Sequence, residues 1–201
     1  MAVFLVIYML SSTGVNAGTY YEDDALYAAH QHASEFTAVT ELLFVTKQTT
    51  QFFADLRTLC QGMRKLRANG PNSFLYIVYS APPHSRTNVK AFVSTLTTGF
   101  TATATGWRHH RNTIVYQTSQ GQPPSSYKIM FADRSRGCFI LVYFGLANAR
   151  GCRLLQTVST VDAGIPNECN RVYMNNCQKK NMKIYYPICG QRLPHIVEWG
   201  N

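Results

Sequence analysis

Cysteine is the residue type whose number and placement carry the clearest chemistry in this chain. Five of the six cysteines fall in the last third of the 201 residues, and an apolar run precedes them all at the N-terminus. An even number of cysteines behind a secretory leader is typical of a disulfide framework, whereas in a cytosolic protein it would favour metal ligation or catalysis. The sequence therefore predicts a disulfide-stapled protein, with bridges built from Cys60, Cys138, Cys152, Cys169, Cys177 and Cys189.

Other chemistry-bearing patterns are weak. The sequence has no Gly-x-Ser-x-Gly elbow, no P-loop and no His-Glu-x-x-His zinc helix. The pairs His30/His32 and His109/His110 lack the i, i+4 spacing with which a helix presents two imidazoles to one zinc ion. We therefore predict neither enzymatic activity nor a bound metal or other cofactor.

Residues 1–17 have the pattern of a signal peptide. An uncharged apolar run leads to Val15-Asn16-Ala17, a small-x-small cleavage signal, and the alternative for this run is a first core strand. We expect a secreted, extracellular product in which residues 18–201 form a single domain around one core. No later stretch reaches the roughly 18 to 20 apolar residues that a membrane span requires, so no membrane partner is predicted.

The chain is basic, with 19 Lys and Arg against 10 Asp and Glu and a formal net charge of +9. Such an excess favours anionic partners, including heparin-like glycans, anionic lipids and nucleic acid. The basic residues are scattered in small groups, however, and none forms a run of five or more. A solvated basic surface is therefore the preferred interpretation, an anionic-glycan site is the alternative, and no nucleic-acid partner is predicted.

The elements that must position these residues are mostly short strands separated by turn signals. Acidic residues at 22–24 suit a helix N-terminus, and a short alanine-rich helix is predicted at 25–33. A second helix is predicted at 166–181, with Pro166 near its start. The segment 56–66 is ambiguous because its leucines and methionine also have helical spacing. The strand-forming segments are 36–50, 74–79, 89–98, 101–107, 113–118, 127–133, 138–144 and 152–160.

Side-chain alternation in two of these segments favours a barrel over a sandwich. In 74–79 and in 139–144 both faces of the strand are apolar, so neither face can turn fully to water. One face needs a core or a cavity, and the other face needs a cover. An all-β fold meets both needs, namely an eight-stranded antiparallel barrel with a short N-terminal helix and a C-terminal helix packed outside.

Motifs in the last 60 or so residues resemble a known family. A strand that ends near an Asp leads to a cysteine, a second cysteine opens the next strand, and an Ile-Pro-x-x-Cys turn starts the outer helix. These motifs are Asp133, Cys138, Gly151-Cys152, Ile165-Pro166-Asn167-Glu168-Cys169, Tyr173-Met174-Asn175-Asn176-Cys177 and Cys189. The pattern resembles the tick salivary lipocalins of the histamine-binding protein family, and the leader, the N-terminal helix and the aromatic strand at 74–79 are similar too.

The resemblance implies a lipocalin secreted in tick saliva that sequesters a small host mediator and so suppresses host defence at the feeding site. Histamine or another biogenic amine is the ligand that it implies, and a monomer is expected. It also implies the disulfide pairing, which the cysteine count alone leaves open. The implied pairs are Cys60–Cys189, Cys138–Cys169 and Cys152–Cys177.

Two departures from the family pattern bear on the ligand. In amine-binding members the cysteine at 138 is usually followed by Asp and the cysteine at 152 by Glu, whereas here Phe139 and Arg153 follow. A protonated amine needs a buried carboxylate to offset its desolvation, so the amine site lacks two acidic positions. If Arg153 or the basic patch 108–111 points inward, the barrel suits a carboxylate on an apolar tail, such as a fatty acid or an eicosanoid.

Other residues could still build an amine site. Glu41 and Asp133 are the preferred carboxylates. Strand alternation places Asp133 on the face of Tyr127, Ile129 and Phe131, and an exposed strand-end position beside Arg134 is its alternative. Glu41 could face either a cavity or the solvent. Tyr76 and Trp107 are the preferred aromatic partners for a cation, with plain core packing as the alternative. The full set of candidate carboxylates is Glu35, Glu41, Asp55 and Asp133.

A function of another class competes with ligand sequestration. The chain would then be a protein- or glycan-binding module that acts through its basic exterior, and side chains would fill its barrel.

Overall fold

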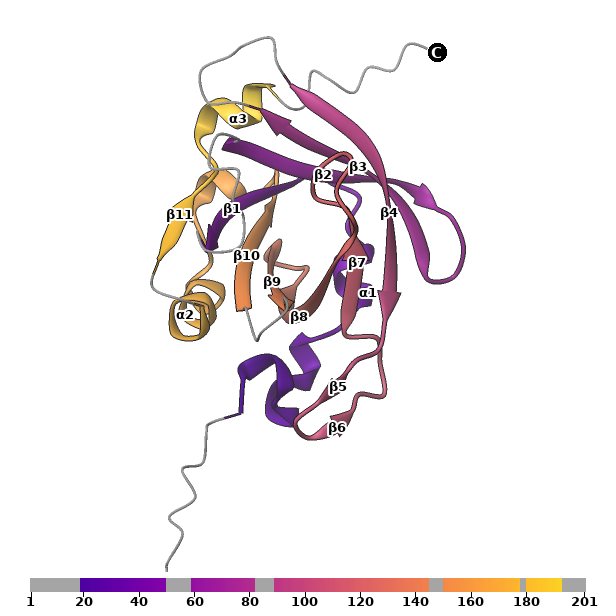
Figure 1. Cartoon of the computed structure of the whole chain (residues 1–201). Coiled ribbons are helices and arrows are strands. Elements are labelled where there is room, and N and C mark those ends of the chain that lie inside the picture. The colour runs from indigo at the N-terminus through magenta and orange to yellow at the C-terminus, as the bar shows by residue number, and fades with distance from the viewer. Residues whose placement is uncertain (1–18, 50–58, 82–88, 145–149, 178–179, 193–201) are drawn as a thin grey trace, which may run out of the picture.

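The protein folds into a closed antiparallel barrel, seen in a computed structural model that describes residues 19–49, 59–81, 89–144, 150–177 and 180–192 (Figure 1). β10 pairs with β1 from Leu43↔Thr157 to Gln48↔Arg153, and this pairing closes the sheet. The eight barrel strands are β1 (Leu43–Thr49), β2 (Leu59–Ala68), β3 (Ser73–Ala81), β4 (Lys90–Gly99), β7 (Thr113–Tyr116), β8 (Ser125–Asp133), β9 (Cys138–Phe144) and β10 (Arg150–Thr157). The predicted eight-stranded barrel is confirmed.

Short helices and minor strands surround the barrel. β5 and β6 form a separate two-stranded sheet, and β11 pairs with the edge of β1. Within the described residues no helix is long and apolar enough to cross a membrane. The remaining elements are η1 (Tyr21–Asp23), η2 (Ala25–His30), α1 (Ala33–Thr37), β5 (Ala102–Thr103), β6 (Gly106–Trp107), η4 (Val161–Ala163), α2 (Asn167–Asn176), β11 (Asn181–Lys183) and α3 (Pro187–Arg192).

One end of the barrel, here called the base, is closed by α1. The base carries the turns at 69–72 and 134–137 and the connection 100–112. The Ala33 amide at the start of α1 donates to the carbonyl oxygen of Arg111 in that connection over 2.8 Å. Phe36 on α1 is fully buried, and its ring lies 6.4 Å from that of Tyr76 and 5.4 Å from that of Phe139. The base is therefore filled by aromatic side chains.

Both faces of the apolar strands are buried, as the sequence predicts. In β9, Phe139 packs in the barrel interior, whereas Ile140 packs in an outer cluster with residues of α2. In β3, Tyr76 belongs to the interior, and Ile77 belongs to a second outer cluster with Tyr185. The outer helices and the C-terminal segment thus supply the cover that this alternation requires.

Three disulfides fasten that cover to the barrel. Two of them join α2 to neighbouring strands, β9 and β10, and the third joins α3 to β2. The bridges are Cys138–Cys169, Cys152–Cys177 and Cys60–Cys189, the pairing that the family resemblance implies.

Local structure differs from expectation in four places. The helix predicted at 166–181 ends at Asn176, and Asn181 begins β11. The predicted strand 101–107 is instead a tight hairpin, because Gly106 adopts a φ of +99° and Thr103 Oγ1 donates to its carbonyl oxygen. The segment 36–50 is strand only from Leu43, since α1 occupies its beginning. The predicted N-terminal helix is split into η2 and α1. The ambiguous segment 56–66 contributes to β2, within its described part.

Candidate functional site

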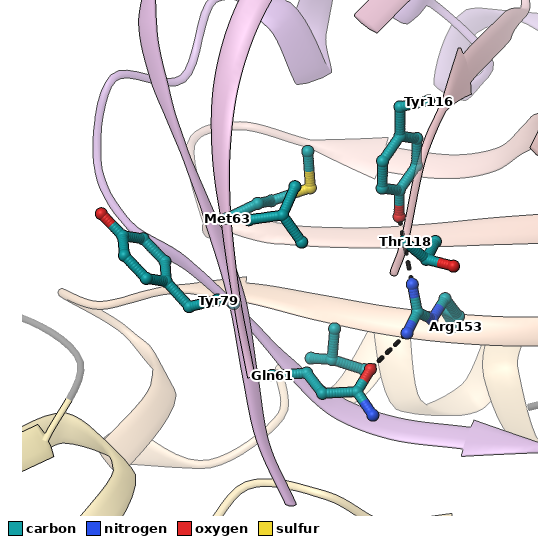
Figure 2. Close-up of a pocket in the computed structure, with 9 residues that line it drawn as sticks. Gln61, Met63, Tyr79, Tyr116, Thr118 and Arg153 are labelled. Carbon is teal, nitrogen blue, oxygen red and sulfur yellow. Dashed lines mark hydrogen bonds between the residues drawn. The ribbon is translucent and has the colours of Figure 1, made fainter. Parts of the chain in front are cut away.

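A small pocket lies inside the barrel among β1, β2, β3, β7 and β10 (Figure 2). Its volume is about 10 Å³, and a single water molecule needs about 10–15 Å³ on this measure. This pocket therefore has room for no more than about one water molecule. The lining residues are Val45, Gln61, Gly62, Met63, Val78, Tyr79, Tyr116, Thr118 and Arg153.

Arg153 is the charged side chain of this pocket. Strand alternation positions it: Cys152 must point outward to bond Cys177 on α2, so its neighbour in β10 points inward. The residue is only 5% exposed. Burial alone would lower the pKa of the guanidinium, but the phenol groups of Tyr116 and Tyr127 outweigh it, so the pKa is raised and the cation is retained.

Neutral oxygen atoms hold the guanidinium in place. Nε donates to Gln48 Oε1 over 3.3 Å, and Nη1 donates to the Tyr116 hydroxyl over 3.3 Å. Nη2 donates to Gln61 Oε1 (Figure 2). The Tyr79 ring in the same view points away from Arg153. The described contacts thus orient Arg153 across the barrel, toward β1, β2 and β7.

Two further polar atoms in the interior lack a hydrogen-bond partner among the described residues. They are Nε2 of Gln48 and the hydroxyl of Tyr76, both fully buried. Burial and the nearby Tyr116 raise the pKa of Tyr76, so its hydroxyl keeps its proton and remains able to donate. Buried polar groups without partners are uncommon and call for an explanation. Because Gln48 Oε1 accepts from Arg153 Nε, the unpartnered Nε2 of Gln48 lies beside the guanidinium, and the two groups offer neighbouring donors to an acceptor-rich ligand group.

The four sequence-predicted ligand residues do not come together at this pocket. Tyr76 lies in the interior cluster, close to Tyr116. Glu41 is exposed just before β1, where its carboxylate accepts from the Ser159 amide over 3.2 Å. Trp107 is 68% exposed on the β5–β6 hairpin.

Asp133 shapes a turn rather than lining the pocket. Its carboxylate accepts from Ser135 Oγ over 2.6 Å and from the Arg136 amide over 3.0 Å. Burial alone would raise the pKa of this carboxyl group, but these hydrogen bonds and the Arg136 charge hold it below the ordinary value. The turn ends at Gly137, whose φ of +60° and contact with Thr157 exclude a side chain.

The other two candidate carboxylates give the pocket no acid either. Glu35 is half-buried on α1 and does not line the pocket, and Asp55 lies outside the described residues. Within the described residues, no group of three or more His, Cys, Asp or Glu is arranged to hold a metal ion.

Sequence reasoning missed Gln48, Gln61 and Tyr116, which hold the Arg153 guanidinium. Their polar side chains alternate with apolar ones in the strands, which from sequence alone equally indicates a solvent face. Cys152 could have indicated this site. If Cys152 bonds to the outer helix, Arg153 must face inward, and the barrel topology then predicts which strands surround it.

Known proteins are similar to this chain in sequence profile and in fold. The sequence matches the family profile described as tick histamine binding protein over residues 21–191. No curated protein sequence matches the chain. Among solved structures, Japanin from Rhipicephalus appendiculatus bound to cholesterol is similar with a TM-score of 0.53 and 16% identity, over 73% of this chain and 92% of that one. Insecticyanin from the tobacco hornworm Manduca sexta is similar with a TM-score of 0.53 and 7% identity, over 78% of this chain and 83% of that one. At these identities the likeness shows a shared lipocalin fold.

Proposed function

The chain belongs to the tick histamine-binding protein family, and from that premise we propose that it is a secreted lipocalin that sequesters a small host mediator. We further propose that this mediator is a lipid with a carboxylate head group, such as a fatty acid or an eicosanoid, rather than an amine. Residues 1–17 would be removed on secretion. The function requires affinity and stoichiometry, with no chemical step, and it would suppress host defence by lowering the free concentration of the mediator.

The buried cation of Arg153 is the observation that carries the proposal. A guanidinium presents several N–H donors in one plane and matches the two oxygens of a carboxylate. Here it faces the pocket, and Gln48, which accepts from its Nε, carries the unpartnered Nε2 beside it. A carboxylate can accept from all of these donors, whereas an ammonium group can accept from none of them.

The same interior offers little to an amine. No Asp or Glu is among the pocket-lining residues that the structure describes. The two positions that carry acids in amine-binding relatives are occupied by Phe139 and Arg153, and both face the interior. A buried ammonium beside a buried guanidinium would be strongly unfavourable, because both cations lose hydration and repel each other. Japanin, which has a similar fold, is bound to cholesterol in its structure, and this supports a lipid as the ligand class.

A titration with three ligands that share one tail tests the head-group assignment. Decanoic acid, decanol and decylamine present an anionic, a neutral and a cationic head on the same ten carbons, and histamine is the fourth probe. We expect decanoate to bind best by calorimetry. Hydrogen bonds to charged groups contribute about 1.5–3 kcal/mol, so Arg153→Gln should weaken decanoate binding roughly 10- to 100-fold and leave decanol unchanged.

Arg171→Gln is the matched control, since Arg171 lies on the outer face of α2 with a side chain 65% exposed. This variant should bind all four probes as the wild type does. Tighter binding of decylamine or histamine than of decanoate would overturn the head-group assignment.

The small volume of the pocket favours a second candidate function. A barrel already filled by side chains is what a protein- or glycan-binding module requires, and the +9 charge would then act on anionic glycans. Retention on heparin that decreases steeply with salt, combined with no heat from any decyl ligand, would select this function over sequestration.

A further inference from the structure

The pocket beside Arg153 is too small to hold the proposed ligand. Ligand pockets of proteins enclose about 300–1,000 Å³, whereas the pocket beside Arg153 measures about 10 Å³. A tail of several methylene groups can therefore enter only if part of the wall or its side chains moves. The part that moves should be the one held by the fewest backbone hydrogen bonds.

The wall is least continuous between β1 and β2. Among the described residues these two strands pair only at Leu43↔Met63 and Phe44↔Gly62. Beyond Phe44, the same edge of β1 pairs instead with β11, from Lys47↔Lys183 to Thr49↔Asn181. Residues 181–185, which we call the C-terminal strap, therefore complete the wall that β2 leaves open, and Figure 1 shows β11 lying beside β1.

Among the described residues, the backbone bonds of the strap are unequally shared between β1 and β2. On the β1 side, the Ile184 amide donates to the Thr46 carbonyl oxygen over 2.9 Å, in addition to the β11 pairing. On the β2 side, the Cys60 amide donates to the Ile184 carbonyl oxygen over 3.2 Å. Cys60 itself has a φ of +57°, which is unusual for a residue other than glycine and marks where β2 turns away from regular pairing.

Side chains of the strap belong to the barrel interior. Ile184 is 0% exposed and lies in the interior cluster, and Met182 packs against that cluster. Met182 also pairs directly with Gln48, the residue that accepts from Arg153 Nε. The strap thus presents two apolar side chains close to the cationic group.

The strap is tethered at both ends. At its beginning, Asn181 Oδ1 accepts from the Tyr173 hydroxyl of α2 over 2.8 Å. At its end, the Tyr185 hydroxyl donates to Asp162 over 2.8 Å, and the Cys60–Cys189 bridge follows in α3. A segment that is fixed at its ends, paired to β1 along one edge and joined to β2 only through the Cys60 amide can move away from β2 without leaving the protein.

We propose that the C-terminal strap is a displaceable wall of the ligand site, and that Met182 and Ile184 determine the length of the apolar tail that the site accepts. The inference rests on the proposed function for the identity of the ligand. The carboxylate binds at Arg153, and the tail extends toward the strap because the opposite direction is filled by the aromatic side chains of the base. Outward movement of the strap supplies the missing volume.

A chain-length series tests the specificity of the strap. Octanoate, decanoate, dodecanoate and tetradecanoate are titrated into the wild type, into Ile184→Ala and into Ile140→Ala. Ile140 is an equally buried control, because it lies in the outer cluster beneath α2. The Ile184→Ala variant should favour longer acids, with affinity rising roughly fourfold for each further methylene that is accommodated. Identical chain-length profiles for all three proteins would overturn the role of Ile184.

Hydrogen exchange of the wild type tests the movement of the strap without any variant or ligand. The amides of Ile184 and Cys60 should exchange together and at least roughly tenfold faster than the Ile129 amide, which donates to Asn112 within the barrel over 2.8 Å. Protection of Ile184 and Cys60 equal to that of Ile129 would contradict a displaceable wall. If the wild type binds no acid at all, the proposed function fails, while these exchange rates still decide whether the strap opens.

Discussion

The buried ion pair between Glu22 and Arg150 should be the most sensitive electrostatic contact in the protein. Arg150 Nε and Nη2 each donate to one Glu22 oxygen over 2.9 Å, and the Glu22 side chain is 0% exposed. The guanidinium also stacks on the Tyr20 ring, 4.8 Å from its centroid. This pair fastens the N-terminal segment to the start of β10, and the same segment continues into α1, which closes the base.

Replacing Glu22 with Ala leaves Arg150 largely buried without its counter-charge. Breaking a buried pair in this way costs about 3–5 kcal/mol, a large share of the about 5–15 kcal/mol that stabilises a typical domain. For a domain of about 150–250 residues each kcal/mol lowers Tm by about 2–4 °C. Glu22→Ala should therefore lower Tm by roughly 6–20 °C.

Thermal melts followed by circular dichroism measure this effect. The control is Glu168→Ala, because Glu168 makes a solvent-exposed pair with Arg171 at 3.8 Å, and such pairs contribute only about 0–1 kcal/mol. The double variant Glu22→Ala/Arg150→Ala should lose less than the sum of the two single variants, since neither charge is then left alone. Equal small shifts for Glu22→Ala and Glu168→Ala would refute the assignment of Glu22 as a buried anchor.

Three further predictions concern the scaffold. Burial, with the neighbouring His32, lowers the pKa of His110 below 6.5. The unfolded chain therefore takes up a proton more readily than the folded protein does, and the stability should fall as pH drops below about 6.5. The variant His110→Phe should flatten the dependence of Tm on pH. Phe36→Ala should lower the free energy of unfolding by about 3–5 kcal/mol in urea titrations, because the side chain is fully buried at the base; a loss below about 1 kcal/mol would contradict that role. The double variant Cys152→Ser/Cys177→Ser opens a loop of 25 residues, so it should lower the free energy of unfolding by about 3 kcal/mol without abolishing decanoate binding. An unchanged urea midpoint would show that this bridge does not stabilise the fold.

The barrel could be predicted because its signals are local and redundant. Apolar residues on both faces of 139–144 require a core on one side and a cover on the other, and the structure supplies both. Cys152 and Cys177 independently indicate which side of a strand is covered, because a disulfide between strand and outer helix requires Cys152 to point outward from β10. The inward position of Arg153 follows from that bond.

Features that depend on long-range pairing could not be predicted in the same way. Nothing in the local pattern of residues 181–185 indicates that they complete a wall between β1 and β2, because that role depends on where β2 leaves β1. The positions of Asp133 and Trp107 away from the pocket depend on local contacts. Asp133 lies on the predicted strand, but a Ser135 hydroxyl and a backbone amide next to it satisfy its oxygens locally, and Trp107 follows the tight turn that Gly106 permits.

The two residues that depart from the family pattern lie at different depths of one barrel, and under the proposed function this would set the direction of the bound ligand. Phe139 faces inward near the base, where its ring packs edge-on against Phe36 at 5.4 Å and contributes to the closure of that end. Arg153 faces inward beside the pocket, where Gln48, Gln61 and Tyr116 orient it. A carboxylate at Arg153 therefore has aromatic packing on its base side, and its tail must turn toward Met182 and Ile184. Tight binding should therefore need both an anionic head for Arg153 and an apolar tail that extends to the strap, and a ligand that lacks either feature should bind weakly.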